Sequence, residues 1–524
     1  MNTFAHLLED VVRSPNPRAL WGSAAARFCA AILPLLLASC GGGGGSGGGG
    51  APAVGVGIEP SAQFAGALES AAPGAGALAS DWVGATCTDG MQKNWVRSRL
   101  YENYLFYRDA PLTSIDPNTY TNTVNNLFLD YTVRGVPAKD RFSFVRTQAE
   151  ADALFQSGTA TNVGFTLKRD ANNGSIYRIA YVEPNGPAVA AGFARGMVLA
   201  TINGVATSTS IPTALSDKLY NSAAGTSSLI GVQDVVGGPV RTLTVASATY
   251  ATSPLIVDRV LPDATTGYLA FNSFSTPVGE IQLADAFKRF AAAGVTDLVV
   301  DLRYNGGGFI DIASQLGYMV AGQAQSSGKI FESLIFNDKR SAANVSIAFN
   351  STVTRLFGNN ARAGEPLSAL NLRRISVLTT GSTCSASESF INALQGIDID
   401  VLLVGSATCG KPYGFIQANN CALAFFGIEF EGRNNKGSVT PLTGVPATCA
   451  ATDDFDHALG DPAERMLATA VTYRLAGVCP ALAAATSGTR SLHAAGAQNS
   501  SAVNADVEFM TDPLNSIKLY RPAR

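Results

Sequence analysis

Histidine is scarce in this chain of 524 residues, which contains only His6, His457 and His493. A Ser-His-Asp triad therefore has one realistic base, His457, because His6 falls in an N-terminal leader and His493 in an Ala/Ser-rich tail. The stretch FDHALGDPAERML around His457 favours a role at the start of the following helix over a role in chemistry. The HExxH motif of zinc proteases is also missing.

Other ligand-binding patterns are missing too. The chain has no CxxC pair and no cysteine-histidine spacing of a zinc site. The glycine run at 306–308 is not followed by GK[ST] and is not part of a GxGxxG motif, so it lacks the marks of a phosphate-binding loop. With 37 basic and 40 acidic residues, the net charge of -3 gives no case for nucleic acid or an acidic membrane surface. We expect no metal, no cofactor and no nucleic-acid partner.

What the chain does contain is enough apolar sequence for a folded protein. Its hydrophobic content of 46% excludes a wholly disordered protein, and its length allows two or three domains with sizeable cores.

The N-terminus reads as a secretory leader. The apolar run at 28–37 is too short for a spanning helix, and three arginines precede it, Arg13, Arg18 and Arg27. The run ends in Leu-Ala-Ser-Cys at Cys40, which resembles the bacterial lipobox, where the cysteine is lipidated and becomes the first mature residue. An ordinary cleavage site beside a cysteine is the alternative. We predict a lipoprotein signal peptide over 1–39.

A tether follows the predicted lipid anchor. The stretch GGGGGSGGGGAPA begins at residue 41 and cannot form a core, and residues up to 80 stay rich in Ala, Gly and Pro. Several acyl chains together hold a protein on a membrane more firmly than one. Gly41 is not the aspartate associated with inner-membrane retention. We expect the protein to lie in the bacterial cell envelope, where it is anchored through Cys40 and faces the periplasm. The outer membrane is favoured over the inner membrane.

Six cysteines remain once Cys29 leaves with the leader and Cys40 is assigned to lipidation: Cys87, Cys384, Cys409, Cys421, Cys449 and Cys479. An even number in an oxidising compartment favours disulfide bonds. Fifteen pairings are possible, and the sequence does not choose among them.

Ordered structure is expected to begin with a small helical domain over 81–156. Apolar and aromatic residues recur at near-helical spacing at Trp95, Leu100 and Tyr104, and again between Tyr120 and Tyr131. We interpret these aromatic side chains as core residues and not as a ligand platform.

Short strands follow over 157–252, and they resemble a PDZ domain of the kind found in bacterial proteases. The resemblance rests on Val163-Gly164-Phe165 at the family's carboxylate-binding loop, on Gly186-Pro187-Ala188 at the helix start and on Ile202-Asn203-Gly204-Val205. Met197 departs from the aspartate usual in the family. The resemblance implies that an extended peptide adds as a strand and that loop N–H groups hold its carboxylate. A degenerate module that only packs against its neighbour is the alternative.

Residues 253–480 read as β-α-β units with right-handed crossovers. A buried strand at 299–303 is followed by Asn305 and three glycines, which allow backbone N–H groups to approach a reacting carbonyl closely.

A second strand at 375–378 leads through a small polar turn, 381–387, into a helix with an apolar stripe at Phe390, Ile391 and Leu394. A serine in that turn lies at a helix N-terminus, where unpaired N–H groups favour an oxyanion. Ser385 or Ser387 acting only as a helix cap is the alternative.

Four signals in order resemble the C-terminal processing, or tail-specific, proteases over roughly residues 95 to 475. They are Gly267-Tyr268 with Ser273-Phe274, the run Asp301 to Gly308, the turn Ser385-Ala386-Ser387-Glu388, and Val404-Gly405 with Gly410-Lys411. The resemblance implies an α/β fold with a crotonase/ClpP-like β-α-β core, a PDZ-like β-rich domain and a small N-terminal helical domain. Residues 481–524 are predicted to be an Ala/Ser-rich segment and tail.

By this resemblance, the nucleophile is Ser385, three residues before Glu388, and the base is Lys411. Their separation of 26 residues is one more than the family usually has. The oxyanion donors would be the N–H of Ala386 and that of Gly307 or Gly308. A glutamine often orients the lysine, but Phe415 stands at its expected place. Gln417, two residues on, would share the side of Phe415 on a continuous strand.

The residues by themselves also favour a lysine base. To accept a proton near pH 7, Lys411 must be buried among apolar groups that lower its pKa from about 10.4. Leu402, Leu403, Val404, Tyr413 and Phe415 are candidates for that setting. Cys384 and Cys409 stand beside Ser385 and Lys411, so disulfides are expected to brace these loops.

The predicted function is a serine endopeptidase that uses a Ser-Lys dyad and an acyl-enzyme to cleave envelope proteins with accessible C-terminal tails. The alternative is a catalytically silent, peptide-binding lipoprotein of the same fold. A penicillin-recognising Ser-Lys hydrolase is disfavoured, because its SxxK motif would need lysine where Glu388 stands.

Overall fold

The computed structural model describes residues 87–170, 173–207, 211–354, 361–480 and 518–519. The predicted signal peptide at 1–39, Cys40, the tether at 40–80 and most of 481–524 lie outside these ranges. Within them, no helix has both the length and the apolar character needed to cross a membrane. All of the described residues belong to one structural unit, Val54–Arg524.

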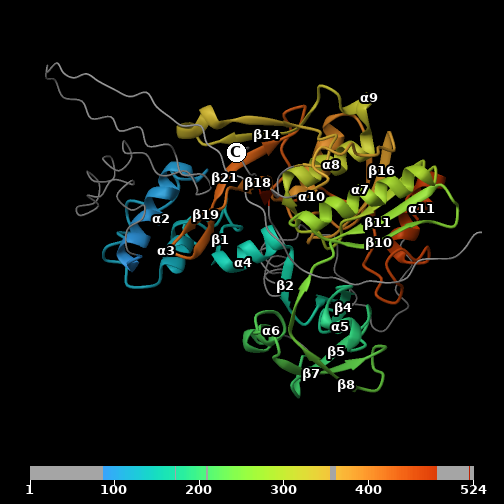
Figure 1. The fold of residues 1–524 in the computed structure, drawn as a ribbon, viewed down its shortest axis with the longest axis horizontal. Helices are drawn as coiled ribbons and strands as arrows, with labels where there is room; N and C mark the ends of the chain where they lie inside the picture. The colour runs from blue at the N-terminus through green and yellow to red at the C-terminus, as the bar shows by residue number, and fades with distance from the viewer. Residues whose placement is uncertain (1–86, 171–172, 208–210, 355–360, 481–517, 520–524) are drawn as a thin grey trace, which may run out of the picture. The chain divides into compact units, whose positions relative to one another are not determined.

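The helices that open the described chain do not have a core of their own. They are α2 (Asp89–Asn103) and α3 (Val124–Tyr131), drawn in blue in Figure 1. The Thr88 and Thr123 side chains cap them by accepting the N–H groups of Met91 and Asn126. The Trp95 and Phe128 rings each lie 5.4 Å from the ring of Phe425, which is more than 290 residues later in the chain. These helices therefore complete the large core, which they share with residues of 253–480.

A six-stranded antiparallel sheet with a separate small core follows. Its order is β3-β4-β5-β7-β8, with bounds Phe165–Arg169, Tyr177–Val182, Val198–Ile202, Ser227–Gln233 and Arg241–Ala246. The short helices α5 (Pro187–Ala190) and α6 (Thr213–Tyr220) accompany it, and β6 (Val205–Ala206) pairs with β5. Strand β3 lies at an edge of the sheet. The chain enters and leaves this domain side by side, because β2 (Thr159–Asn162) pairs with β9 (Ala248–Ala251).

The central sheet of residues 253–480 has the order β10-β11-β12-β16-β17-β22. The strands are Leu255–Val260, Thr266–Phe271, Asp297–Asp301, Arg374–Thr379, Asp400–Gly405 and Cys449–Ala450. All neighbours pair in parallel except β10 with β11. Three crossover helices are α7 (Pro277–Ala292), α8 (Ile310–Ala321) and α10 (Ala386–Gly396), and α11 (Arg465–Ala476) follows β22.

Alternation along the strands explains how both faces of this sheet are covered. Leu298 and Val300 of β12 belong to the large core together with residues of α7, α8 and α10. Val299, between them, belongs to a second core that includes Met466 and Leu467 of α11. Since successive strand residues point to opposite faces, the three crossover helices lie on one face and α11 on the other.

The parallel register decides where the functional loops lie. Asp301 pairs with Leu378, and Leu378 pairs with Val404. The loop after β12, the turn after β16 and the loop after β17 therefore leave the same edge of the sheet. Ligands in open parallel sheets bind at this carboxyl edge.

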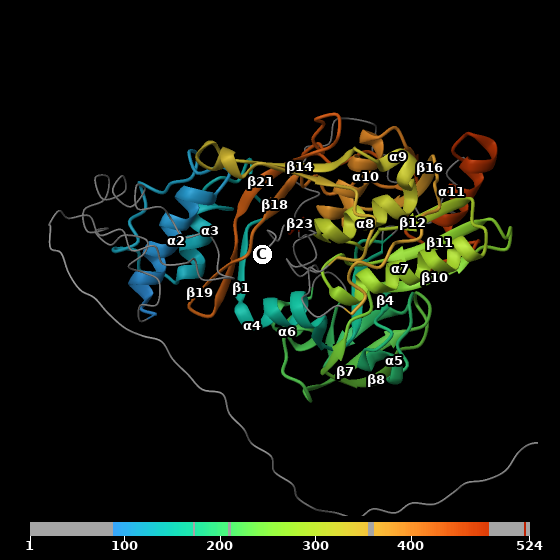
Figure 2. The ribbon, with the colours of Figure 1, turned by 45° about the horizontal axis from the view of Figure 1, so that its top comes forward.

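A third sheet, seen in Figure 2, borders that edge and has the order β13-β23-β18-β21-β14-β15. Its strands are Gly308–Phe309, Lys518–Leu519, Tyr413–Phe415, Ile428–Arg433, Ile330–Phe336 and Val345–Ala348. A smaller sheet joins β1 (Phe144–Thr147) to β20 (Leu423–Phe426) and β19 (Ala418–Asn420). The remaining short elements are α4 (Gln148–Asp152), a π-helix at Ala153–Ser157, α9 (Gln323–Ser326) and a 3-10 helix at Asp338–Ala343.

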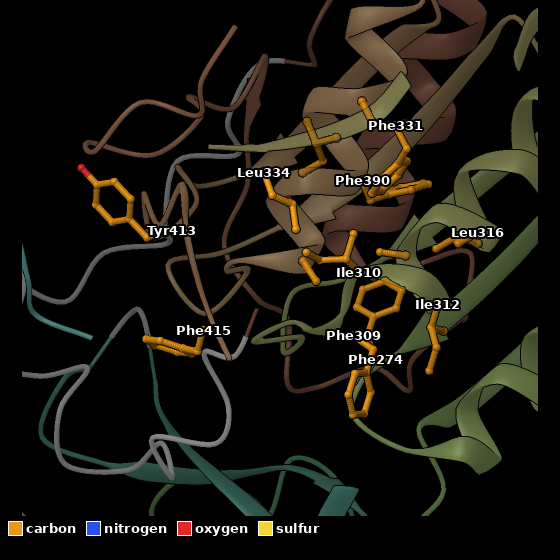
Figure 3. Close-up of a cluster of buried hydrophobic side chains, with 14 of the residues drawn as sticks. Phe274, Phe309, Ile310, Ile312, Leu316, Phe331, Leu334, Phe390, Tyr413 and Phe415 are labelled. Carbon is orange, nitrogen blue, oxygen red and sulfur yellow. The ribbon is translucent and has the colours of Figure 1, made fainter. Parts of the chain in front are cut away.

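Buried apolar side chains pack next to the glycine loop and the serine turn. Phe274, Phe309, Ile310 and Phe390 belong to the large core and are drawn in Figure 3. Phe309 follows the glycine run directly, and Phe390 lies on α10 behind the serine turn. The two loops are thus held by one packed cluster of side chains.

Candidate active site

Ser385 lies at the junction between the turn after β16 and helix α10. Its backbone has φ 62° and ψ -114°, a conformation that non-glycine residues rarely adopt. Its side-chain hydroxyl is buried and has no hydrogen-bond partner among the described residues. Backbone strain of this kind, at a serine whose oxygen is unused by the fold, is typical of a nucleophile held for reaction.

The other serines of the turn have partners. The Ser387 hydroxyl donates to the Asn305 carbonyl oxygen at 3.0 Å, and Ser389 donates to Glu332 at 3.1 Å. The Ser382 hydroxyl accepts a hydrogen bond from the Lys168 ammonium of β3 at 2.8 Å. This geometry favours Ser385 over its neighbours, although its chemical role remains a prediction.

The Glu388 carboxylate joins the serine turn to the lysine loop. It is fully buried and accepts the N–H of Ser385 at 2.9 Å, the N–H groups of Gly410 and Lys411 at 2.8 Å each, and the Thr408 hydroxyl at 2.5 Å. Sequence reasoning assigned Glu388 only to the first turn of the helix. Its partners in the lysine loop lie 20 to 23 residues away, so no local pattern could have identified them.

Lys411 is fully buried between aromatic rings. Its ammonium nitrogen lies 3.9 Å from the centre of the Phe415 ring and 5.1 Å from that of Phe142. The predicted apolar setting thus includes Phe415, and the sequence analysis missed Phe142, which is 269 residues earlier. Gly410, just before Lys411, has φ +80°, and a side chain there would meet the Leu442 carbonyl oxygen at 2.1 Å.

The strand argument for Gln417 is wrong. It assumed that one strand continues through residue 417, but β18 ends at Phe415 and β19 begins at Ala418, with an irregular register at Gly414 and Phe415. Alternation therefore does not place Gln417 on the side of Phe415. The Gln417 side-chain amide donates to the Asn419 side chain at 2.9 Å. An orienting role for Gln417 stays a prediction.

The glycine loop lies against the serine turn. The Asn305 carbonyl oxygen accepts the Cys384 N–H at 3.1 Å as well as the Ser387 hydroxyl. Gly307 and Gly308 have φ of 110° and 139°, and a side chain at Gly308 would meet the Phe274 backbone at 2.2 Å. The structure distinguishes between Gly307 and Gly308 as the predicted oxyanion donor. The Gly307 N–H already donates to the Asn305 side chain at 2.8 Å.

Ala386 is the first residue of α10. The N–H at this position has no intrahelical partner, because the first four N–H groups of a helix lack a preceding carbonyl. It therefore lies beside the Ser385 side chain at the partly positive end of the helix.

Disulfide bonds are present, as predicted, and all six described cysteines are paired. The pairs are Cys87–Cys421, Cys384–Cys409 and Cys449–Cys479. Cys384 precedes Ser385, and Cys409 lies two residues before Lys411, so the second pair braces the site. These sulfurs are bonded to each other, so the cluster of Cys384, Cys409 and Glu388 has no thiolate to offer a metal. Three disulfides indicate an extracytoplasmic compartment.

We expect the Cys384–Cys409 disulfide to matter for activity beyond its effect on stability. The double variant Cys384→Ala/Cys409→Ala should lose about 3 kcal/mol of unfolding free energy and at least about tenfold in activity, because both loops loosen. Cys449→Ala/Cys479→Ala is a matched control, since the sequence separations are 25 and 30. Urea unfolding and peptidase rates measure both effects. Equal activity losses in the two variants would contradict the prediction.

In the β3-β4-β5-β7-β8 domain, N–H groups of the predicted peptide-binding loop already donate hydrogen bonds to other residues of the domain. The Val163 N–H donates to the Leu219 carbonyl oxygen at 3.1 Å, and the Gly164 N–H donates to the Asn162 side chain at 2.7 Å. Phe165 is buried and starts β3. A peptide carboxylate would have to replace these contacts, whereas the outer edge of β3 pairs with no strand in the described chain.

Glu183 gives this region a predicted pH dependence. It follows β4, and its carboxylate accepts the Ser253 N–H at 3.1 Å, while burial raises its pKa from 4.5 to about 7. Because the folded state holds the proton more tightly, the unfolding free energy should fall as pH rises from about 4.5 to about 7. Urea unfolding at several pH values should show this slope in the parent and lose it in Glu183→Gln. An unchanged slope would contradict the assignment.

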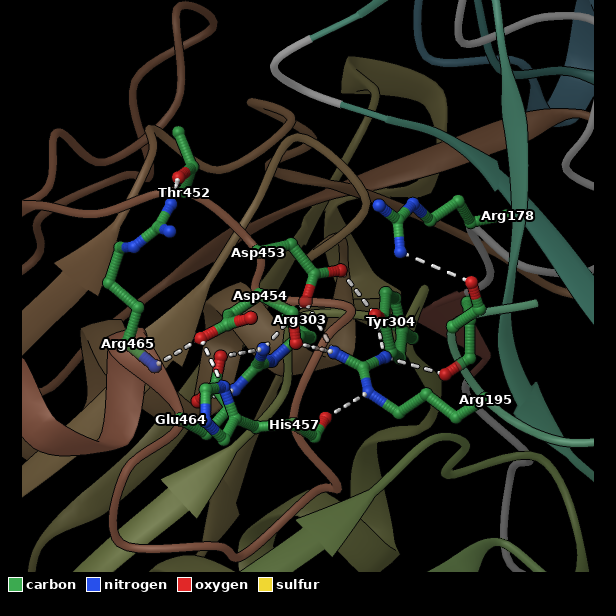
Figure 4. A network of polar contacts seen from close by, with 12 residues as sticks. Arg178, Arg195, Arg303, Tyr304, Thr452, Asp453, Asp454, His457, Glu464 and Arg465 are labelled. Atoms are coloured by element: carbon green, nitrogen blue, oxygen red, sulfur yellow. Dashed lines mark hydrogen bonds and ion pairs between the residues drawn. The ribbon is translucent and has the colours of Figure 1, made fainter. Parts of the chain in front are cut away.

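An ion-pair network ties the same domain to the catalytic region (Figure 4). Arg195 pairs with Asp453 at 2.7 Å and donates to the Tyr304 hydroxyl at 2.7 Å. The fully buried Arg303 pairs with three carboxylates, those of Asp301, Asp453 and Glu464. Tyr304 immediately precedes Asn305, so this network positions the start of the glycine loop.

His457 belongs to a different part of this network. Its imidazole contacts the Asp454 carboxylate at 2.8 Å, and the same carboxylate accepts the Arg465 N–H at the start of α11. These contacts support the interpretation that His457 helps to begin that helix.

A strained serine at a helix N-terminus, a glycine loop beside it and a buried lysine on a loop tied to the serine turn are typical of serine hydrolases. Residues 265–418 match the model of peptidase family S41. The chloroplastic C-terminal processing peptidase of Tetradesmus obliquus is 26% identical over 277 residues, which are 50% of this chain and 53% of that protein. The chain thus spans about half the length of this relative.

Solved structures agree with the family match. A crystal structure from Bacteroides fragilis, assigned to the S41 proteases, is 25% identical with a TM-score of 0.58, covering 73% of this chain and 97% of that one. Residues 265–418 of this chain are thus similar to peptidase family S41, and the fold of the described chain is similar to that of the Bacteroides fragilis structure. A Ser-Lys dyad is typical of this family.

Proposed function

We propose that the protein is a serine endopeptidase with Ser385 as nucleophile and Lys411 as base. The observation that carries the proposal is the buried Ser385 hydroxyl, which has no partner among the described residues. It stands on a turn that Glu388 and the Cys384–Cys409 disulfide tie to the lysine loop. The core around it is of the crotonase/ClpP-like kind.

In the proposed mechanism, neutral Lys411 takes the proton of the Ser385 hydroxyl as its oxygen attacks the peptide carbonyl carbon. The Ala386 N–H and the N–H of Gly308 stabilise the resulting oxyanion, with Gly308 preferred because the Gly307 N–H is bonded to Asn305. The tetrahedral intermediate collapses, and the protonated lysine delivers its proton to the leaving amine. Water then hydrolyses the ester, with Lys411 again acting as base.

The PDZ-like domain would bring the substrate to this site. An extended C-terminal tail adds to the free edge of β3, where main-chain hydrogen bonds supply affinity without demanding one sequence. Val163, Gly164 and Phe165 would line the end of that groove. Contact of β3 with the serine turn through Lys168 and Ser382 supports such a path. The substrates would be envelope proteins with accessible C-terminal tails.

Anchoring at Cys40 would hold the enzyme at the envelope, facing the periplasm. The tether of residues 40–80 separates the anchor from the folded region and would let it reach loose tails near the membrane. The outer membrane is favoured, because Gly41 follows the cysteine.

A fluorophosphonate that labels activated serines tests the function directly. The full-length protein should be labelled at Ser385, located by peptide mass spectrometry, and Lys411→Ala should not react. Absence of labelling together with retained peptide binding would overturn the proposal and favour a catalytically silent peptide-binding lipoprotein.

A further inference from the structure

The third sheet contains a strand from the far end of the described chain. Strand β23 (Lys518–Leu519) lies between β13 (Gly308–Phe309) and β18 (Tyr413–Phe415) and pairs with both in parallel. Lys518 is opposite Gly308, and Leu519 is opposite both Phe309 and Phe415. Figure 2 shows β23 beside β18.

The two strands that flank β23, β13 and β18, also carry or adjoin residues of the proposed active site. Strand β13 begins at Gly308, the preferred second oxyanion donor. Strand β18 begins two residues after Lys411, and its Phe415 ring contacts the Lys411 side chain. The Asn305 carbonyl oxygen holds the glycine loop against the turn that carries Ser385. A backbone between β13 and β18 therefore runs past the reacting groups.

A substrate has to use the same position. For one carbonyl oxygen to reach the Gly308 N–H, the substrate backbone must lie along β13. Strand addition relies on main-chain hydrogen bonds, so the position accepts many sequences, including a segment of this chain. Without β23, the facing edges of β13 and β18 would present unpaired backbone groups.

We propose that the segment containing Lys518–Leu519 is an intramolecular competitor that occupies the strand position of the substrate. The inference takes the identity of the site from the proposed function. The strand pairing itself is observed in the structure and does not depend on that function. Because the segment belongs to the same chain as the site, its pairing is intramolecular and competes with substrates whatever the protein concentration. Because such strand addition is held by main-chain hydrogen bonds, a substrate backbone can take over the same pairing and displace the segment.

The kinetic test uses the full chain with Leu519→Pro. Proline removes an N–H donor and restricts φ, so it weakens pairing at the residue opposite both flanking strands. For cleavage of a disordered protein, KM should fall about tenfold while kcat stays unchanged. Ala494→Pro, which adds a proline earlier in the same tail, should leave both constants as they are. An unchanged KM in Leu519→Pro would overturn the proposal.

A binding measurement separates this inference from the proposed activity. A fluorescent peptide of residues 510–524 is titrated into full-length Ser385→Ala and into Ser385→Ala/Leu519→Pro. The second protein should bind the peptide about tenfold more tightly, because its own segment no longer fills the position. Equal affinities would overturn the inference even if the enzyme is active. Tighter binding in a protein that cleaves nothing would uphold the inference while the proposed function fails.

Discussion

Ser385→Ala and Lys411→Ala are each expected to lower kcat/KM for a disordered protein substrate by about 10⁴-fold or more. The first removes the proposed nucleophile and the second removes the proposed base, and the two losses should not add if these residues act as one unit. Folding should be preserved in Ser385→Ala, since its hydroxyl has no hydrogen bond to lose. Cleavage followed by gel or mass spectrometry, with thermal unfolding alongside, measures both properties.

Ser382→Ala is the matched control for this experiment. The Lys168 ammonium donates a hydrogen bond to the hydroxyl of Ser382, which lies three residues before the proposed nucleophile. Burial lowers the pKa of Lys168 from 10.5 to about 8. Lys168 and Ser382 are therefore an alternative candidate for the base and the nucleophile. Ser382 does not lie at the helix N-terminus, however, and lacks its N–H donors. Retained cleavage in Ser385→Ala, with loss in Ser382→Ala, would move the site to the rival pair.

Glu388→Ala should produce the largest combined loss of stability and activity. Its carboxylate accepts four donors from the serine turn and the lysine loop, and removing it leaves buried N–H groups without partners. We expect the unfolding free energy to fall by about 3–5 kcal/mol. The activity should fall by about 10² to 10³, since both loops lose their common support. Urea unfolding and cleavage rates measure the two effects.

Glu150 supplies the comparison, because it has the same position in α4 that Glu388 has in α10. Its carboxylate accepts the Thr147 N–H at 3.0 Å and completes a capping box at a site remote from the lysine loop in sequence. Glu150→Ala should cost only about 1 kcal/mol and leave cleavage unchanged. If Glu388→Ala behaves like Glu150→Ala, then Glu388 is a helix cap and does not join the two loops.

Much of the catalytic region could be predicted because its signals are local. A buried strand followed by glycines, and another followed by small polar residues and an amphipathic stripe, indicate loops at strand ends. Parallel strands then bring those ends to one edge, as the pairing of Asp301 with Leu378 and of Leu378 with Val404 does here. The family resemblance, confirmed by the match over residues 265–418, depended on this order.

The remaining features depend on contacts between distant residues. Phe142 lies beside Lys411, and Trp95 packs against Phe425, although hundreds of residues separate the members of each pair. The strand argument for Gln417 failed because β18 ends at Phe415, and only tertiary packing determines where this strand stops.

For the stretch from 371 to 415, the sequence by itself determined a strand, a serine turn, a helix, a second strand and a lysine loop. Those elements follow from apolar periodicity and turn residues within a few positions of one another. Only the tertiary structure decided which serine has an unused hydroxyl, that Glu388 joins the two loops, and that residues 518–519 lie between β13 and β18. The physical reason is that burial and hydrogen-bond satisfaction depend on neighbours brought together by folding, which no local pattern records.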